Sequence, residues 1–309
     1  MHIVADVRNT EERFEDVILT IGCFDGVHLG HQQILKTLVQ EAAAIKGTPA
    51  VMTLEPHPRQ FFSPQNAPNI LTTTPIKYRL LKSCGVEVLY VLPFDAGTVA
   101  LSPQQFVESI IVDRCHAVRI VVGHDFAFGD NAAGDYDFLT SAADVYGFKV
   151  LQVPPFIIGG QRVSSTLIRE RVIQGEVDNL KEFLGRNFSL YGSITPGRGI
   201  GRSLGFPTAN LDIGPGVVPA HGVYAAEAIV NGTSHPAAVN IGIAPTIRDE
   251  QPLVEAHLID FSGTLGPAKM ELVLHKRLRP EKKFASHHAL IKAIAADVQY
   301  VREYFKRVT

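Results

Sequence analysis

The fold of the first half is decided by residues 17–31, VILTIGCFDGVHLGH. Val17–Gly22 is a short, apolar and largely β-branched run, which predicts a buried strand. A helical pattern follows from about Gln32 to Lys46, and Gly47 and Pro49 end it. Its apolar face is formed at helical spacing by Ile34, Leu35, Leu38, Val39, Ala42 and Ile45. The stretch therefore predicts a strand, a short loop and a helix in direct succession.

The same alternation of strand and helix continues along the chain. Further strands are predicted at Ala50–Leu54, Gly85–Leu92, Val118–Gly123 and Lys149–Val153, with helices between them such as Pro103–Arg114. Strands that alternate with helices are typical of a parallel sheet covered by helices on both faces. The first half is thus predicted to be a doubly wound α/β domain.

The pattern changes near residue 185. A helix from about Ser165 to Gly175 and a short one ending at Leu184 are followed by strands and turns rich in glycine and proline. Strands are predicted at Gly222–Val230, His235–Ile241, Leu253–Leu258 and Lys269–Arg277. Short strands without helices between them favour a small antiparallel β-barrel. We therefore expect two domains, residues 1–185 and residues 186–309.

One helix is predicted at the end of the chain. Ser286 can cap its first turn. Its apolar stripe is formed by Leu290, Ile294, Val298, Val301 and Phe305.

Composition narrows the class of protein. The chain has 309 residues, of which 46% are hydrophobic and 19% charged, and its formal net charge is -2. This balance is that of a globular protein and gives no overall basic field for nucleic acid. Cys23, Cys84 and Cys115 are far apart and odd in number, which argues against a disulfide framework or a cysteine zinc site. No signal peptide and no membrane-spanning run of about 20 apolar residues is expected. The expected location is the cytoplasm; an oligomer is possible but nothing in the sequence indicates one.

His28 and His31 stand where the predicted loop meets the predicted helix. The N-terminus of a helix binds anions, because its first N–H groups point outward. Gly26 and Gly30 would let a polyphosphate approach the backbone, and the two imidazoles add donors that stabilise charge on a phosphate. This favours attack of a phosphate on the α-phosphorus of ATP. The alternatives are two surface histidines or a zinc site, for which no further ligands appear at a typical spacing.

Three other segments lie where parallel strands or their connections end. Ser164, Ser165 and Thr166, with Arg169 on the next turn, could clamp a polyphosphate, although hydroxyls at a helix start often only cap it. EPHP at 55–58 and GHDFAFG at 123–129 follow predicted strands, where open α/β sheets bind ligands. Phe62, Phe126 and Phe128 could line a flat aromatic ligand; taken singly, each is more often a core residue.

The second half carries a glycine-rich loop, GRGIGRSLGFPTAN, at residues 197–210. Such loops can fold over phosphates. Thr208 and Asn210 are small oxygen ligands that suit Mg²⁺, while the simpler alternative is a barrel turn held by their side chains. In VEAHLIDF, residues 254–261, period-2 alternation puts Glu255 and His257 on the face opposite Val254. Glu255 is either a surface charge or a general base that accepts an alcohol proton.

The first half resembles the bacterial FAD synthetases of the nucleotidylyltransferase superfamily, through TIGCFDGVHLGHQ, TLEPHP, GHDFAFG and SSTLIR. The resemblance implies that His28 and His31 stabilise the ATP phosphates. It implies further ATP contacts at Gly22, Phe24, Asp25, Gly26, Gly30, Ser164, Ser165, Thr166 and Arg169. It places the flavin near Pro56, Pro58, Phe62, Asp125 and Phe128. This sequence has Leu54 where phenylalanine is usual in the family, and Ala127 and Asn131 where basic residues are common.

The second half resembles the riboflavin kinase module, through GRSLGFPTAN, GVYAAEA, VNIGIAPT, VEAHLIDF and RLRPEKKF. The resemblance implies that Thr208 and Asn210 bind the Mg²⁺-nucleotide, that Gly199 and Gly201 contact ATP, and that Glu255 is the catalytic base. Together the two resemblances imply a bifunctional transferase with the substrates riboflavin, FMN and ATP. It would phosphorylate riboflavin to FMN and then adenylylate FMN to FAD.

Three alternatives stay open at this stage. One is an FMN adenylyltransferase with an inactive kinase module. A second is nucleotidyl transfer to another phosphate acceptor, such as phosphopantetheine. A third, from another class, is a flavin-binding regulator that does not turn over.

Overall fold

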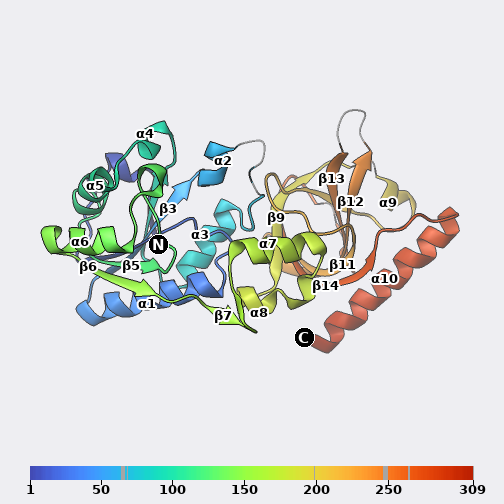
Figure 1. The fold of residues 1–309 in the computed structure, drawn as a ribbon. Coiled ribbons are helices and arrows are strands. Elements are labelled where there is room, and N and C mark those ends of the chain that lie inside the picture. Colours follow the sequence, from blue (N-terminus) through green and yellow to red (C-terminus); the bar gives the residue numbers. More distant parts are fainter. Residues whose placement is uncertain (64–66, 68, 198, 246–249, 264, 309) are drawn as a thin grey trace. The chain divides into compact units, whose positions relative to one another are not determined.

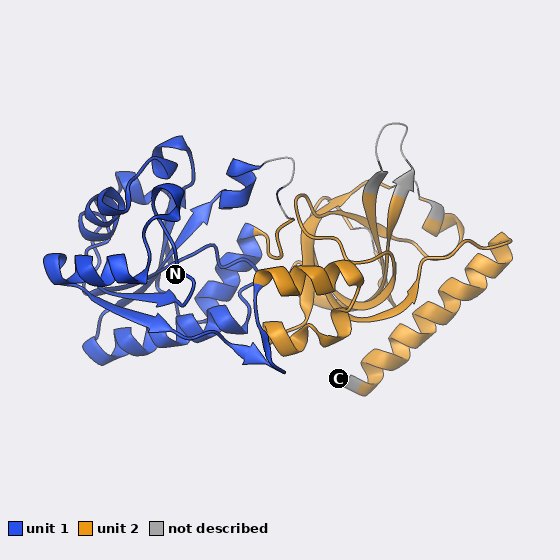
Figure 2. Ribbon diagram, in the orientation of Figure 1, with its two compact units in different colours: residues 1–68, 74–164 blue, residues 69–73, 165–309 orange. Residues whose placement is uncertain are grey.

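The computed structural model describes residues 1–309 except 64–66, 68, 198, 246–249, 264 and 309 (Figure 1). The chain divides into two compact units (Figure 2). Unit 1 comprises Met1–Pro68 and Thr74–Ser164, and unit 2 comprises Asn69–Thr73 and Ser165–Thr309. None of the helices in the described part of the chain has the length and apolar character that a membrane crossing requires.

Unit 1 is built on a six-stranded parallel sheet with the order β1-β4-β3-β2-β5-β6. The strands are β1 (His2–Val4), β2 (Val17–Ile21), β3 (Thr48–Glu55), β4 (Val88–Pro93), β5 (Ala117–Gly123) and β6 (Lys149–Val153). The helical segments are η1 (Val7–Asn9), α1 (Leu29–Ile45), α2 (Pro58–Phe62), α3 (Thr74–Ser83), α4 (Ala96–Val99), α5 (Pro103–Phe106), η2 (Val107–Val112), η3 (Asp130–Ala132) and α6 (Tyr136–Tyr146). A hairpin of β7 (Ile157–Ile158) and β8 (Gln161–Arg162) follows β6. The predicted α/β domain is confirmed.

Both faces of this sheet are buried. Alternate residues of one strand enter two different cores: Val17 and Leu19 of β2 belong to one cluster and Ile18 to the other. The first cluster takes Phe106, Ile110 and Leu139 from the helices on its side, and the second takes Leu35 and Leu38 of α1. A parallel sheet covered on both faces needs near-continuous apolar strands. VILTI, fully buried from end to end, satisfies that requirement.

Unit 2 contains a closed antiparallel barrel with the order β10-β13-β12-β11-β14-β9. The strands are β9 (Phe188–Thr195), β10 (Ala209–Asp212), β11 (Gly222–Val230), β12 (Thr233–Pro245), β13 (Glu250–Leu258) and β14 (Lys269–Pro280). The helical segments are α7 (Ser165–Gln174), η4 (Val177–Asn179), α8 (Lys181–Leu184), α9 (Ile200–Ser203) and α10 (His287–Val308). The predicted barrel is confirmed, together with the C-terminal helix.

The C-terminal helix α10 packs on the barrel through the predicted stripe. Val298, Val301 and Phe305 form a buried cluster with Ala225 of β11 and Ile259, and Ile294 packs at its edge. Ser286 caps the helix as expected, because its Oγ accepts the N–H of Ala289 at 3.2 Å. This packing positions one wall of the pocket described below.

Several local predictions differ from the structure. The predicted helix Pro103–Arg114 is divided, since α5 ends at Phe106 and a π-helical turn, η2, follows. Helix α1 starts at Leu29, three residues before the predicted Gln32, because His28 serves as its cap. The sequence did not predict β9, where Gly192 interrupts the pattern; an added Cβ there would lie 1.9 Å from the carbonyl oxygen of Asp212.

The predicted domain boundary between residues 185 and 186 falls between the end of α8 at Leu184 and the start of β9 at Phe188. The compact units divide between Ser164 and Ser165, and α7 and α8 group with the barrel.

Candidate active sites

The loop between β2 and α1 fixes the first histidine. His28 is the N-cap of α1, and its Nδ1 accepts the backbone N–H of His31 at 3.3 Å. A nitrogen that accepts a hydrogen bond carries no proton, so the neutral ring has its proton on Nε2. The capping bond thus orients the imidazole and leaves it with a donor on its far edge.

The second histidine lies against the first. The rings of His28 and His31 are stacked, with centroids 3.7 Å apart and planes 15° from parallel. Burial, and then the charge that His28 would carry, lower the pKa of His31 well below its ordinary value of 6.5. His31 is therefore neutral at physiological pH, and it acts on an anion through a hydrogen bond rather than through a full charge.

The loop itself has an unusual backbone. Phe24 and Val27 have φ angles of 49° and 39°, in the left-handed region, and Gly26 has φ of 87°. Left-handed φ is an outlier for a β-branched residue such as Val27. Phe24 and Val27 are both nearly fully buried, which holds the loop in this shape. Asp25 is also buried, at 5% exposure.

A pocket of about 680 Å³ opens beside this loop in unit 1. The pocket extends from the loop between β2 and α1 to a wall of aromatic side chains. In that wall, the ring centroids of Phe126 and Phe128 are 5.4 Å apart, and those of Phe62 and Phe94 are 5.7 Å apart. The predicted residues that line it are Gly22, Phe24, His31, Pro58, Phe62, Asp125 and Phe128. Leu54, Ala127 and Asn131, the three departures from the family pattern, line it too. Its size and mixture of apolar walls and few polar groups suit a flat organic ligand.

Asp125 has a partner that the sequence did not reveal. Arg162 of β8 forms an ion pair with its carboxylate. Burial acts to raise the pKa of Asp125, but the hydrogen bond and charge of Arg162 hold it below its ordinary value. The pocket wall has Ala127 and Asn131 where basic side chains are common in the family. The guanidinium of Arg162 places a positive charge beside this wall, next to Asp125.

Several other residues predicted for the first site do not line this pocket. Pro56 follows β3, and Pro58, which does line the pocket, is the first residue of α2, for which His57 is the N-cap. Gly30 lies under the His28 ring, since an added Cβ would come within 3.1 Å of it. Ser164 ends unit 1, whereas Ser165, Thr166 and Arg169 belong to α7 in unit 2. Arg169 is buried there, and its Nε donates to the carbonyl of Asn69 at 2.8 Å.

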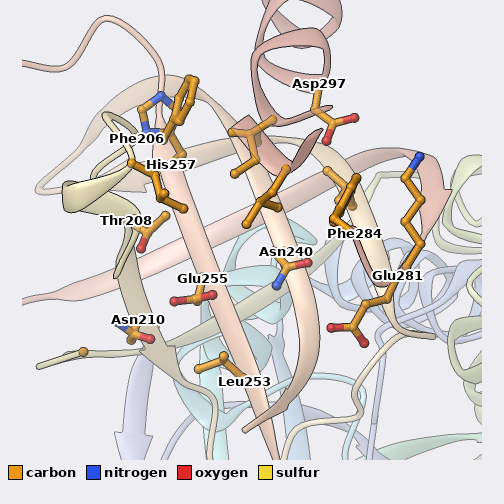
Figure 3. Close-up of a pocket in the computed structure, with 18 of the residues that line it drawn as sticks. Phe206, Thr208, Asn210, Asn240, Leu253, Glu255, His257, Glu281, Phe284 and Asp297 are labelled. Carbon is orange, nitrogen blue, oxygen red and sulfur yellow. The ribbon is translucent and has the colours of Figure 1, made fainter. Parts of the chain in front are cut away.

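The second pocket lies in unit 2 and has a volume of about 720 Å³ (Figure 3). Barrel register places three polar residues in one row across it: Asn210 of β10 pairs with Glu255 of β13, which pairs with Asn240 of β12. All three line the pocket. The opposite side includes Phe284, Leu290 and Ile294, from α10 and the segment before it.

Glu255 points the way that strand alternation predicted. Val254 and Ala256 are buried in the barrel, while Glu255 and His257 are only partly buried and line the pocket. A carboxylate set in such a pocket, rather than on an open surface, is placed to act on a bound molecule.

The glycine-rich loop packs closely on Thr208 and Asn210. A Cβ added to Gly197 would lie 1.8 Å from Asn210 Nδ2, and one added to Gly201 would lie 3.0 Å from Thr208 Oγ1. A smaller pocket of about 280 Å³, lined by Gly197, Gly199 and Arg202, shares Thr208 and Asn210 with the larger one. The two pockets meet at these two side chains, which suits transfer of a group from one ligand to another.

Asn240, Asp297 and Arg279 line this pocket but were not predicted as site residues from the sequence. Asn240 could have been found by the alternation that selected Glu255, since its neighbours Val239 and Ile241 are buried. Asp297 and Arg279 form a bidentate ion pair with an Nη2–Oδ2 distance of 2.8 Å, and both line the pocket. Only the packing of α10 on the barrel brings this pair to the site.

Comparison with known proteins covers the whole chain. The FAD synthetase family profile matches residues 10–167, and the riboflavin kinase profile matches residues 184–305. The bifunctional riboflavin kinase/FMN adenylyltransferase of Pseudomonas fluorescens is 37% identical over 98% of this chain and 97% of its own. That of Escherichia coli K12 is 35% identical over 99% of this chain and 98% of its own.

A solved structure extends the likeness to the fold. A crystal structure described as a macrolide-efflux protein from Streptococcus pneumoniae is 27% identical, with a TM-score of 0.87 over 97% of this chain and 98% of that one. The sheet unit and the barrel unit are both included in that match. The chain therefore belongs to the bifunctional riboflavin kinase/FMN adenylyltransferase family, with an FAD synthetase module followed by a riboflavin kinase module.

Proposed function

We propose that this chain phosphorylates riboflavin with ATP in unit 2 to give FMN and ADP. It then transfers AMP from a second ATP to FMN in unit 1, giving FAD and pyrophosphate. The observation that carries the proposal is the pairing of Asn210 with Glu255 across the β10–β13 ladder, inside a pocket that could hold a flavin. The alignment of the proposed base with the proposed ligand residue favours this function over that of an inactive kinase module.

In the kinase site, Glu255 is the general base. It takes the proton of the riboflavin 5′-hydroxyl as that oxygen bonds to the γ-phosphorus of ATP and the bond to ADP breaks. Glutamate has an ordinary pKa of about 4.3, so it accepts the proton only as the O–P bond forms. Such catalysis contributes about 10² to 10⁴ in rate. The larger pocket, with Phe206, Phe284 and Ile294, suits the flavin, and the smaller one suits ATP.

Thr208 and Asn210 would hold Mg²⁺ together with the phosphates of ATP. Their neutral oxygens fit an ion that keeps several waters and takes few protein ligands. Among the described residues, no group of three or more His, Cys, Asp or Glu side chains could hold a metal by itself. Mg²⁺ would neutralise phosphate charge, while the glycine loop positions Asn210.

In the adenylylation site, a phosphate oxygen of FMN attacks the α-phosphorus of ATP and pyrophosphate leaves. His28 donates from Nε2 to a phosphate oxygen, and the stacked His31 supports it. Arg162, paired with Asp125, supplies positive charge where Ala127 and Asn131 do not. Gly22, Phe24, Asp25, Gly26, Gly30 and Ser164 of unit 1 contact ATP. The resemblance implies ATP contacts for Ser165, Thr166 and Arg169 as well, which belong to α7 of unit 2. Pro56, Pro58, Phe62 and Phe128 contact the flavin.

We place the boundary between the two catalytic modules at residues 185 and 186, between α8 and β9. A cytoplasmic location is part of the proposal; the sparse and widely spaced cysteines, which predict no disulfide framework, suit a reducing compartment.

Two variants test the assignment of the sites. Glu255→Ala should stop FMN formation from riboflavin and spare FAD formation from supplied FMN. The double variant His28→Ala, His31→Ala should do the opposite. Unchanged kinase turnover in the first, or surviving FAD synthesis in the second, removes that site from the proposal. A flavin-binding regulator would show neither turnover.

A further inference from the structure

One residue of the kinase pocket has a bond that the proposed reaction does not use. The Nδ1 atom of His257 lies 2.8 Å from the carbonyl oxygen of Pro207, the residue just before Thr208. Its ring also packs edge-on against Phe206, with centroids 5.6 Å apart (Figure 3). His257 therefore holds the end of the glycine-rich loop on the strand that carries Glu255.

The position of this bond matters because of the barrel register. The β10–β13 ladder pairs Asn210 with Glu255 and Ala209 with Ala256, and β10 begins at Ala209. One residue further, the same register puts Thr208 opposite His257. There the His257 side chain contacts Pro207, which precedes β10. The imidazole thus links β13 to the turn that carries Thr208, beyond the last backbone pair of the two strands.

The other side of the turn is held as well. Phe206 donates its N–H to the carbonyl of Gly201 at 2.8 Å, and a Cβ on Gly201 would lie 2.5 Å from the Phe206 carbonyl. The turn from Phe206 to Thr208 is thus bonded on one side to Gly201 of the glycine-rich loop and on the other side to His257. Movement of His257 would be passed to Thr208 through two backbone bonds.

The chemistry of the bond sets the state of the ring. A carbonyl oxygen can only accept, so Nδ1 of His257 must carry a proton. Both the neutral Nδ1–H tautomer and the imidazolium satisfy this. An asparagine amide can place a donor near the same point, because its nitrogen is as many bonds from the backbone as Nδ1.

We propose that His257 is a positioning residue of the kinase site, whose Nδ1–H bond to Pro207 fixes Thr208 relative to Glu255 for the Mg²⁺-nucleotide. The inference rests on the proposed kinase activity of unit 2. Residues that orient ligands in this indirect way typically change metal affinity or activity by about 10- to 100-fold when removed.

The test compares three variants of the full chain. His257→Leu removes the donor, His257→Gln moves it one bond further out, and His257→Asn keeps it. We expect Leu and Gln to raise the KM for Mg-ATP by about tenfold or more, with the KM for riboflavin little changed, and Asn to stay close to wild type. The unchanged KM for riboflavin checks that the pocket of unit 2 is intact in each variant, and FAD formation from supplied FMN checks unit 1. Equal behaviour of all three variants, whether active or impaired, would overturn the role of the bond.

A second measurement does not need turnover. In the metal-free wild-type protein, ¹⁵N–¹H correlation spectra of the His257 ring should show a proton on Nδ1. A ring with its proton on Nε2 and a bare Nδ1 overturns the inference directly. If the wild-type chain made no FMN, the proposed function would fail, while the spectrum would still decide whether the bond exists.

Discussion

Gly197 packs so closely on Asn210 that adding a single methyl group there should slow the kinase reaction. An alanine at Gly197 would place its Cβ 1.8 Å from Asn210 Nδ2 and 2.8 Å from Asn210 Cγ. Non-bonded heavy atoms attract best at about 3.5–4.0 Å, so the Asn210 amide must move by on the order of 1 Å or more. A misplacement of about 1 Å can cost about 100-fold in rate, or about 2.7 kcal/mol of activation free energy.

The assay follows both flavin products in one protein. With riboflavin, ATP and Mg²⁺, Gly197→Ala should form FMN about 100-fold more slowly than wild type. FAD formation from supplied FMN should be unchanged, because that site is in unit 1. Gly266→Ala is the matched control: its added Cβ would meet no atom within 4 Å, and it should leave both rates unchanged.

A double-mutant cycle identifies the cause of the loss. If Gly197→Ala acts by displacing Asn210, it should have no further effect in a chain that already carries Asn210→Ala. Wild-type FMN formation in Gly197→Ala, or losses that multiply in the double variant, would refute the reasoning.

Three further predictions concern the other site and the fold. Gly30→Ala brings a Cβ within 3.1 Å of the His28 ring; it should slow FAD formation by about tenfold, with FMN formation unchanged in the flavin assay. Phe305→Ala removes a buried ring between α10 and the barrel and should cost about 3–5 kcal/mol of unfolding free energy, measured by urea denaturation of unit 2; wild-type stability would contradict the packing. Because burial lowers the pKa of His31 below 6.5, the unfolded chain binds more protons there than the folded one, and stability should fall as the pH drops below about 6.5. The fall should be smaller in His31→Asn, and an identical pH dependence of the melting temperature would count against a buried neutral ring.

Much of the fold follows from local pattern. VILTI, with Leu35 and Leu38 behind it, correctly predicts strand β2 and the body of helix α1, because a strand buried on both faces must be almost entirely apolar. The stripe that ends at Phe305 likewise predicts the helix that covers the barrel. The four-residue strand β10 was not predicted, since its length carries no periodic signal and its partners are distant in sequence.

Sequence pattern also predicts only part of the two candidate sites. Glu255 and His257 were correctly placed on one face by alternation alone. The row from Asn210 through Glu255 to Asn240 depends on barrel register, and the bond from His257 to Pro207 crosses fifty residues of chain. Arg162 approaches Asp125 only through the hairpin after β6. Contacts of this kind are set by tertiary pairing, which single-chain periodicity does not encode.

A time course tests most directly whether one chain carries out the two reactions in succession. Purified protein is incubated with riboflavin, ATP and Mg²⁺, and the flavins are separated as they form. We expect FMN to appear first and FAD to follow. Glu255→Ala should make no FMN, and should make FAD only when FMN is supplied. FMN that never becomes FAD, or FAD that forms only from added FMN in the wild-type protein, would contradict the proposed function.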